Sequence, residues 1–246
     1  MNLSKMKKHA IFFGGLYVLM SIFCVSSFIY FLTAQQTLRA LMCLGTILLV
    51  LLPEGFEKMT QTKLSFALKL FIVLYAIGPM LGHAFKWYYT FPIWDSVLHF
   101  SGGFVFGVVG LFLFACINGK APARKMTKMV FALLFSISIA VLWEFFEYGI
   151  DCLFVMDMQQ DTVLTEINSY LLGDVLGELK SFRDIQSVTI NGEVISTNGY
   201  VDIGLIDTMT DMLVECLGGL VFFIVGLVSQ NENPFFKWNI ESKNDA

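Results

Sequence analysis

The sequence predicts an all-α integral membrane protein with about six transmembrane helices and one extracytoplasmic loop that contains a short helix and a β-hairpin. Apolar residues make up 56% of the 246 positions and charged residues only 15%. The mean hydropathy is +0.69, which is far from the composition of a soluble domain. Separate apolar runs reach the roughly 20 residues that a helix needs to cross a bilayer. We therefore treat 1–246 as a single polytopic membrane domain.

The predicted spans follow one another with mostly short connections. They are 10–32, 38–56, 64–82, 95–117, 127–152 and 207–228. The first run is too long for the apolar region of a signal peptide and lacks a clear cleavage site, so we expect a retained helix. The second span is the weakest, because Arg39 lies near its start and its end, Pro53 to Glu57, is polar. Five spans and a re-entrant segment are the alternative.

Basic residues are distributed unevenly over the segments between the spans, and this imbalance orients the chain. With the N-terminus inside, the inner segments hold Lys5, Lys7, Lys8, Lys58, Lys63, Lys120, Arg124, Lys125, Lys128, Lys237 and Lys243. The outer segments hold only Arg39, Lys86, Lys180 and Arg183. The sequence therefore predicts that both termini lie in the cytoplasm, with 229–246 as a cytoplasmic tail.

The long polar stretch 153–206 is the predicted extracytoplasmic loop. Within it, 161–179 has apolar residues at helical spacing, which predicts a short amphipathic helix at the membrane interface. The segment 188–195 alternates around Asn191-Gly192, a dipeptide that favours the type I′ turn of a β-hairpin. We expect these two elements to form a small cap.

Two functional classes are disfavoured by composition. The five cysteines stand singly, four of them in apolar runs, which argues against a disulfide framework and against a cysteine metal site. They are expected to be small core side chains. No basic patch stands on a soluble domain, so we expect no nucleic-acid partner.

Ionisable residues on three of the spans form the candidate site. Asp95 and His99 open the fourth span, one helical turn apart on one face. Gly103 and Gly107 continue this helix at a spacing that lets another helix approach closely, so packing accounts for them at least as well as catalysis. The sequence places Asp95 and His99 in the outer leaflet.

The fifth and sixth spans each carry an acidic stripe at the same predicted depth. The stripes are Glu144, Glu147 and Asp151 on the fifth span, and Asp207, Asp211 and Glu215 on the sixth. Ionised carboxylates without counter-charges in hydrocarbon are costly, so these acids must be protonated, hydrated, paired or bound to a cation. The acids could form either a metal site or a structural network, and the sequence does not decide between these two interpretations.

The donor set favours a divalent cation such as Mg²⁺, Mn²⁺, Ca²⁺ or Zn²⁺, because oxygen ligands dominate and one imidazole joins them. The candidate metal ligands are Asp95, His99, Glu144, Glu147, Asp151, Asp207 and Asp211. Glu147 and Glu215 are the candidate catalytic residues, each as a general base. Glu215 is the most deeply placed of the acids.

Four motifs of the second half of the chain resemble a known family. They are Trp94-Asp-x-x-x-His-Phe, Trp143-Glu-Phe-x-Glu, Met158-Gln-x-Asp-Thr162 and Gly199-Tyr-x-Asp-Ile-Gly-Leu-Ile-Asp-Thr-x-x-Asp-Met212. As a set, over roughly 90 to 230, they resemble the YjdF-like family of bacterial polytopic membrane proteins, whose function is unknown. The interval from Asp202 to Asp207 is longer than in that family's pattern. The first motif is also distantly similar to VanZ-type membrane proteins.

The resemblance implies a location in the bacterial cytoplasmic (inner) membrane. It also implies that one constellation is formed by Asp95, His99, Glu144, Glu147, Asp207 and Asp211.

Three function classes remain. An enzyme would use the cation to activate water or to polarise a lipid headgroup or lipid-linked phosphate, as a hydrolase or transferase. A transporter would pass a cation or proton, although the inner halves Val108–Cys116 and Leu220–Val228 offer almost no polar side chains. A non-catalytic scaffold would use the acids only to hold helices or a partner. The sequence leaves open whether the protein is an enzyme at all.

Overall fold

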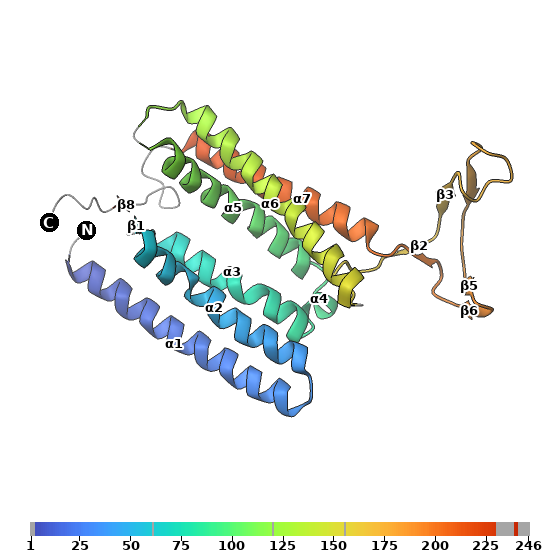
Figure 1. The fold of residues 1–246 in the computed structure, drawn as a ribbon, viewed down its shortest axis with the longest axis horizontal. Coiled ribbons are helices and arrows are strands. Elements are labelled where there is room, and N and C mark those ends of the chain that lie inside the picture. Colours follow the sequence, from blue (N-terminus) through green and yellow to red (C-terminus); the bar gives the residue numbers. More distant parts are fainter. Residues whose placement is uncertain (1–2, 61, 120, 155, 230–238, 241–246) are drawn as a thin grey trace. The chain divides into compact units, whose positions relative to one another are not determined.

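The computed structural model describes residues 3–60, 62–119, 121–154, 156–229 and 239–240 (Figure 1). Its helices are α1 Leu3–Thr33, α2 Thr37–Thr60, α3 Phe66–Ala84, α4 Trp87–Thr90, α5 Trp94–Asn118, α6 Lys125–Phe154 and α7 Leu205–Val228. Its strands are β1 Thr62–Lys63, β2 Val163–Leu164, β3 Ile167–Ser169, β4 Lys180–Phe182, β5 Val188–Ile190, β6 Glu193–Ile195, β7 Tyr200–Val201 and β8 Asn239–Ile240. Lys120, Lys237, Lys243 and most of the predicted tail 229–246 lie outside the described residues.

All six predicted spans are confirmed as helices that are long and apolar enough to cross a membrane: α1, α2, α3, α5, α6 and α7. The weakest prediction, the second span, is one uninterrupted helix of 24 residues that continues through Pro53. Membrane helices tolerate an internal proline, because neighbouring helices and small local adjustments satisfy the freed backbone groups. The re-entrant alternative is therefore not what the structure contains.

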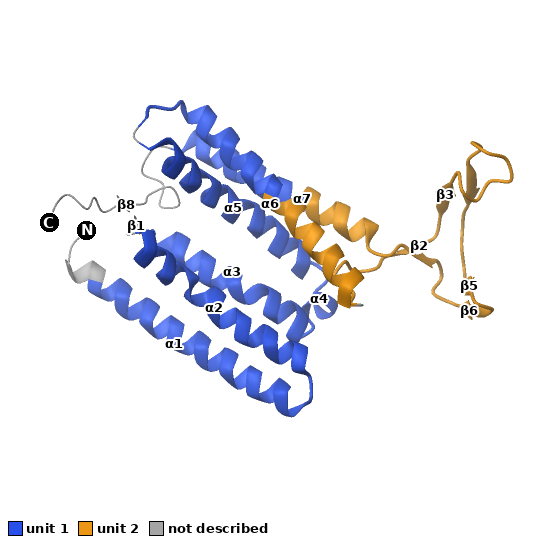
Figure 2. Ribbon diagram, viewed as in Figure 1, with its two compact units in different colours: residues 1–138, 214–246 blue, residues 139–213 orange. Residues whose placement is uncertain are grey.

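The chain divides into two compact units, residues 1–138 with 214–246 and residues 139–213 (Figure 2). The first unit holds α1, α2, α3, α4, α5, the first part of α6 and the last part of α7. The second unit holds the remaining parts of α6 and α7 and the long loop between them.

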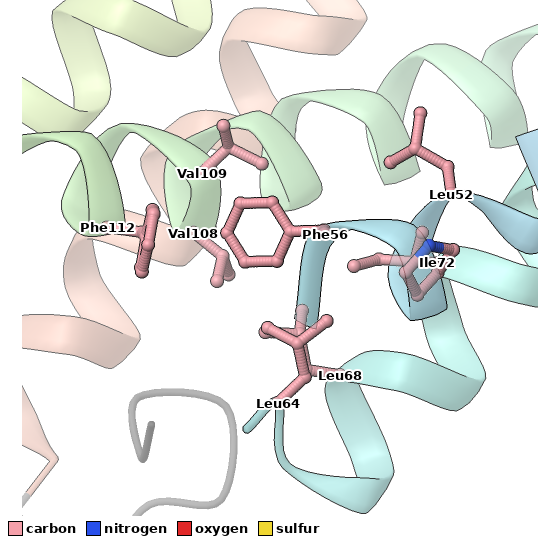
Figure 3. Close-up of a pocket in the computed structure, with 9 residues that line it drawn as sticks. Leu52, Phe56, Leu64, Leu68, Ile72, Val108, Val109 and Phe112 are labelled. Atoms are coloured by element: carbon pink, nitrogen blue, oxygen red, sulfur yellow. The ribbon is translucent and has the colours of Figure 1, made fainter. Parts of the chain in front are cut away.

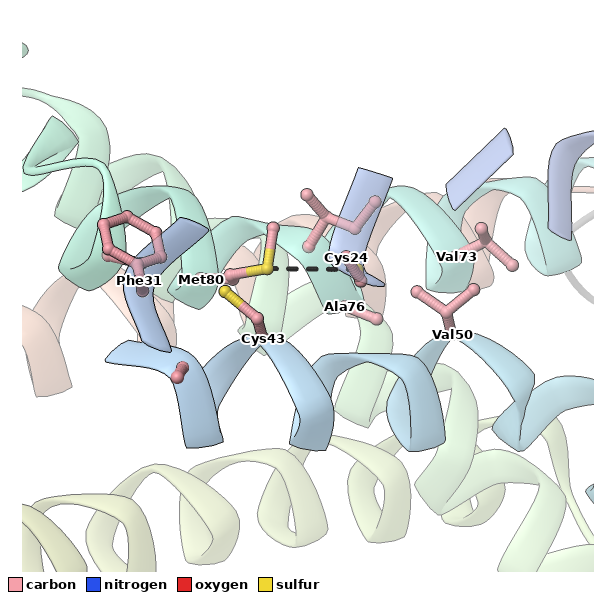
Figure 4. Close-up of a cluster of buried hydrophobic side chains, with 10 residues drawn as sticks. Cys24, Phe31, Cys43, Val50, Val73, Ala76 and Met80 are labelled. Carbon is pink, nitrogen blue, oxygen red and sulfur yellow. Dashed lines mark hydrogen bonds between the residues drawn. The ribbon is translucent and has the colours of Figure 1, made fainter. Parts of the chain in front are cut away.

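The core of the first unit lies where α1, α2 and α3 pack side by side. Cys24, Cys43, Val73 and Met80 are among its fully buried side chains, and the Cys24 Sγ lies 3.9 Å from the Met80 Sδ (Figure 4). In a bilayer such close packing, rather than release of water, holds helices together. All five cysteines are free, as predicted.

Two cysteines contradict the expected core placement. Cys116 on α5 and Cys152 on α6 are exposed. An apolar run in a membrane helix has a lipid-facing side as well as a packed side, so a small side chain in such a run is not necessarily buried.

Helix α5 and the last part of α7 approach each other closely through glycines. A Cβ atom at Gly103 would lie 2.0 Å from the Glu215 carbonyl oxygen, and one at Gly218 would lie 2.0 Å from the Phe100 carbonyl oxygen. The hydroxyl of Ser136 on α6 donates to the Gly103 carbonyl oxygen at 2.7 Å. The packing role predicted for Gly103 is therefore confirmed, and it brings the α7 backbone directly against α5.

In the second unit, the predicted amphipathic helix over 161–179 is wrong. This segment forms β2, β3 and a turn, and β3 pairs antiparallel with β4. Its spacing of apolar residues resembled a helix, but Gly173 and Gly177 weaken helical propensity and β-branched residues are frequent before them. The described part of the loop contains no helix.

The predicted hairpin over 188–195 is confirmed. Strands β5 and β6 pair antiparallel, with Val188 opposite Ile195 and Ile190 opposite Glu193. Asn191 has φ 51° and Gly192 has φ 89°, both in the left-handed region that a type I′ turn requires at its two central positions. Asparagine and glycine tolerate this region better than other residues.

Candidate functional site

The first unit brings three of the predicted residues together in a carboxylate–imidazole cluster, formed by Asp95 and His99 of α5 and Glu215 of α7. The His99 Nε2 lies 3.6 Å from the Asp95 Oδ1, and its Nδ1 lies 3.4 Å from the Glu215 Oε2. His99 and Glu215 are buried, whereas the Asp95 side chain is 20% exposed. One imidazole thus lies between two carboxylates, with the more accessible one at the start of the helix.

Neighbouring helices fix the position of this cluster. The indole Nε1 of Trp94 donates to the Gly78 carbonyl oxygen on α3 at 3.2 Å, which ties the first turn of α5 to α3. Next to the cluster, a Cβ atom at Gly102 would lie 2.8 Å from the Tyr75 hydroxyl and 3.7 Å from the Glu215 Oε1. Glycine at this position therefore leaves room for both polar groups against the face of α5.

One oxygen of the cluster is not satisfied within the described part of the chain. Glu215 is only 3% exposed, and its Oε1 is buried without a hydrogen-bond partner among the described residues. A buried unpaired acceptor is costly, and more so in a membrane, where water does not compensate. The sequence marked Glu215 as the deepest acid, but it gave no sign of Tyr75 beside it.

A cluster of buried apolar side chains lies farther along α5 and α7 in the first unit. Val108, Leu111, Met129 and Phe222 pack there with other buried side chains of α3, α5, α6 and α7. A separate apolar cavity of about 160 Å³ lies between α2, α3 and α5 and is lined by residues such as Phe56, Leu68 and Val108 (Figure 3). An apolar cavity of this size stays dry, so it offers no path for ions.

Asp211 and the acids of α6 belong to the second unit. Asp211 lies one turn before Glu215 on α7 and is 3% exposed, while Glu144 and Glu147 lie one turn apart on α6 and are also buried. The Trp143 Nε1 donates to the Glu147 Oε1 at 2.9 Å. These are carboxylates on continuous membrane helices, as predicted.

The other two acids of the stripes bind backbone groups of the loop. The two carboxylate oxygens of Asp151 accept from the N–H groups of Met158 and Gln159, at 2.7 and 2.9 Å. The Asp207 Oδ2 accepts from the Gln160 N–H at 2.8 Å. Both acids therefore have a structural role at the membrane ends of the loop, and their predicted role as metal ligands stays a prediction.

Asp202, near the end of the loop, also accepts hydrogen bonds from backbone N–H groups. Its carboxylate accepts from the N–H groups of Thr162, Gly204 and Ile206, at 2.8, 3.2 and 2.8 Å. Burial opposes ionisation of Asp202, but the Thr162, Ile206 and Gly204 N–H groups together outweigh burial and hold the pKa of its carboxyl below the usual value. The Met158–Thr162 and Gly199–Met212 motifs thus meet in a hydrogen-bonded neck, which we define as Asp151, Asp202 and Asp207 with their N–H donors.

A second charged cluster in the first unit was missed by the sequence analysis. Lys69 of α3 is buried, and its Nζ lies 2.6 Å from the Glu54 Oε2 and 3.0 Å from the Glu57 Oε2 on α2. Lys63 lies 3.8 Å from the same Glu57 oxygen, and the Leu64 N–H donates to the other. We call this the lysine cluster.

Comparison with known proteins identifies the family. Residues 15–232 match the model of a family described as predicted membrane protein (DUF2238). This match covers most of the chain, so the protein belongs to that family of multi-pass membrane proteins, which has no established function. Neither a curated protein nor a solved structure matches the chain. The resemblance to the YjdF-like and VanZ-type proteins stays a prediction.

Proposed function

We propose that this member of the DUF2238 family binds a divalent cation through Asp95 and His99 and uses it to hydrolyse or transfer a group of a lipid-linked substrate. The observation that carries the proposal is the separation of 3.6 Å between the His99 Nε2 and the Asp95 Oδ1. This is too long for a strong hydrogen bond. Two ligand atoms of one tetrahedral zinc ion lie roughly 3.3–3.6 Å apart, given metal–ligand bonds of about 2.0–2.2 Å.

The second nitrogen of His99 supports the same assignment. A metal-binding histidine commonly donates its other ring N–H to a carboxylate, which fixes the ring and makes it a better ligand. Glu215 lies at the His99 Nδ1, so it would orient the imidazole while Asp95 shares the cation. The unpartnered Oε1 of Glu215 would then remain to accept a proton from a water molecule activated by the cation.

Further ligands are proposed from the helices that carry the acids. Asp211 precedes Glu215 by one turn on the continuous helix α7, so it projects from the same face of that helix. Two carboxylates and one imidazole form a reasonable site for Zn²⁺ or Mn²⁺. Glu144 and Glu147 on α6 are proposed as the acids that complete the coordination, with Glu147 as the alternative general base.

The proposed substrate follows from the surroundings. Six apolar helices make this a multi-pass membrane protein. We propose the bacterial cytoplasmic membrane, with both termini in the cytoplasm and the cluster in the outer leaflet. A phosphate or ester of a lipid would reach this depth sideways from the bilayer, and Asp95, the most exposed member of the cluster, lies at the entrance. No nucleic acid is expected to bind.

Transport is the weaker candidate, because the side chains that pack between α5, α6 and α7 farther along these helices form an apolar cluster that includes the fully buried Phe222. A path for a cation or proton would need polar groups there. A scaffold role, in which a protonated His99 bonds to both carboxylates and holds α5 to α7, has no observation that favours it over metal binding.

Metal content measured by inductively coupled plasma mass spectrometry tests the proposal. Detergent-purified wild type is incubated with Mg²⁺, Mn²⁺, Ca²⁺ and Zn²⁺, dialysed and compared with His99→Ala and Asp211→Asn. We expect about one ion per chain in the wild type and loss of most of it in both variants. Glu54→Gln is the matched control, because it changes a carboxylate of the lysine cluster. We expect this variant to bind as much metal as the wild type.

Absence of stoichiometric metal in a folded wild type with all four ions contradicts the proposal. Retention of the metal in His99→Ala contradicts the assignment of ligands. If metal binds, release of phosphate from a lipid-linked pyrophosphate in proteoliposomes, lost in Asp211→Asn without loss of folding, separates an enzyme from a binding protein.

A further inference from the structure

The turn between β3 and β4 exposes an unusual number of large apolar side chains. We call Tyr170, Leu171, Leu172, Val175 and Leu176 the apolar tip. Leu171 is 94% exposed, Leu176 is fully exposed, and Tyr170 and Val175 are more than half exposed. Burying large apolar side chains away from water is favourable, so an exposed group of five such side chains needs an explanation.

The apolar tip is a folded turn with its own hydrogen bonds. The Leu171 N–H donates to the Ser169 hydroxyl at 3.1 Å, and the Glu178 N–H donates to the Val175 carbonyl oxygen at 3.1 Å. Gly173 lies so close to the chain that a Cβ atom there would be 2.6 Å from the Glu178 carbonyl oxygen. The leucines are therefore presented together by a defined backbone.

One of the two acids in the turn has an ion-pair partner, while Glu178 is exposed. The Lys180 Nζ lies 2.9 Å from the Asp174 Oδ2 and 5.7 Å from the centre of the Phe182 ring. An aromatic residue and a lysine beside an apolar surface are typical of the zone between hydrocarbon and lipid headgroups. This composition fits a lipid surface better than a charged protein partner.

The other hairpin of the same loop shows that such a tip is not required by the fold. The turn between β5 and β6 consists of Asn191 and Gly192, which need only satisfy the type I′ geometry. Both hairpins belong to a loop that starts on α6 and ends on α7, so the bilayer surface is within covalent reach of both. The β3–β4 turn itself holds five large apolar side chains, whereas the two-residue β5–β6 turn holds none and is flanked by the exposed Ile190 and Val194.

We propose that the apolar tip inserts into the headgroup zone of the bilayer on the side of the membrane where the loop emerges. Insertion buries Leu171 and Leu176 among lipid chains, and it keeps the loop on the membrane surface. Such a contact is sensitive to lipid composition. This inference does not depend on metal binding.

An environment-sensitive fluorophore tests the insertion. In a Cys116→Ser, Cys152→Ser background, which removes the two exposed thiols, Leu176→Cys is labelled with a nitrobenzoxadiazole dye in nanodiscs of phosphatidylcholine and phosphatidylglycerol. We expect blue-shifted emission that lipids with brominated chains quench at least twofold. Val194→Cys, at a side chain that is 64% exposed on the β5–β6 hairpin, is the matched control and should show water-like, unquenched emission.

A second variant tests whether the apolar side chains drive the insertion. Leu171→Asp adds a charge to the tip, and we expect it to return the emission of the dye at position 176 to that of the control. Water-like emission at position 176 in the parent protein overturns the proposal. Blue-shifted emission that brominated lipid does not quench also overturns it, because the tip is then covered by protein, such as a second copy of the chain.

Discussion

The lysine cluster and the carboxylate–imidazole cluster are both groups of charges inside the membrane-spanning first unit, but they differ in how well their charges are matched. In the lysine cluster, Lys69 lies 2.6 and 3.0 Å from two carboxylates, at hydrogen-bond distances. In the carboxylate–imidazole cluster, His99 lies 3.4 and 3.6 Å from two carboxylates. The distances between opposite charges are therefore shorter in the lysine cluster than in the carboxylate–imidazole cluster.

We interpret this difference as one between a structural cluster and the cluster for which we propose a function. The acids of the lysine cluster face two lysines, so no further cation is needed there. The Asp95 and Glu215 carboxylates both lie beside the His99 imidazole, and the buried Oε1 of Glu215 has no hydrogen-bond partner among the described residues. Our metal-binding proposal starts from this contrast: a cation would join Asp95 and His99, whereas Lys69 already supplies a positive charge to the acids of the lysine cluster.

The largest expected effect is on the lysine cluster. Lys69→Met removes the buried cation and leaves the buried Glu57 with only the half-exposed Lys63 at 3.8 Å. Breaking a buried ion pair typically costs about 3–5 kcal/mol. We expect a large fall in the midpoint of thermal unfolding in detergent. Metal content should stay unchanged in the fraction that folds.

The double variant Lys69→Met, Glu57→Gln is the control for this interpretation. It removes the uncompensated charge, so much of the lost stability should return. If Lys69→Met unfolds no more easily than wild type, the lysine cluster does not hold α2 to α3. The structural role that we assign to this cluster would then be wrong.

The sequence could predict one of these clusters and not the other, for a physical reason. Asp95 and His99 lie on the same helix, so helical periodicity alone places them on one face. Lys69 and its carboxylates lie on different helices, and pairing between helices has no signature in the spacing of residues. Lys69 also lies within an apolar run, where a single lysine gives little indication of its partner.

The same limit explains the results for the fold. Membrane spans were predictable because bilayer thickness sets the length of each apolar run. The hairpin was predictable because Asn191-Gly192 suits a specific turn. The helix expected over 161–179 failed because a helix of that length depends on packing against a partner, which sequence spacing does not reveal. The exposure of Leu171 and Leu176 shows that no described residue supplies that packing.

A smaller effect is expected at the carboxylate–imidazole cluster. Glu215→Gln keeps the shape of the side chain and its contact with His99, and it removes a buried charge of which one oxygen has no partner among the described residues. The thermal midpoint of the metal-free protein should therefore stay the same or rise. Loss of the carboxylate behind a metal-binding histidine typically costs about 10–100-fold in metal affinity. Isothermal titration with Zn²⁺ measures it. A Glu215→Gln variant that unfolds easily and binds Zn²⁺ normally would show that Glu215 stabilises the fold and does not support metal binding.

The smallest effect is expected at Asp202, outside the membrane-spanning helices. It tests whether a carboxylate with several hydrogen-bond partners stabilises the fold there as well. Three N–H groups match this carboxylate, and its pKa in the folded protein lies below the unfolded value of about 3.9. A carboxyl with a lowered pKa stabilises the fold above the unfolded pKa, and this contribution is lost as pH falls through the folded pKa. We therefore expect the neck to open below about pH 4.

Hydrogen exchange at the Thr162 and Ile206 amides measures this opening, after correction for the intrinsic exchange rate at each pH. Wild type should be protected at about pH 6 and lose protection below about pH 4. Asp202→Asn, which should cost about 1 kcal/mol as the loss of a capping carboxylate does, should be less protected at the higher pH and show no pH step. A step that persists in the variant would assign it to another carboxyl of the neck. In that case, the number of hydrogen-bond partners of a carboxylate would affect stability only inside the membrane, where water cannot replace a missing partner.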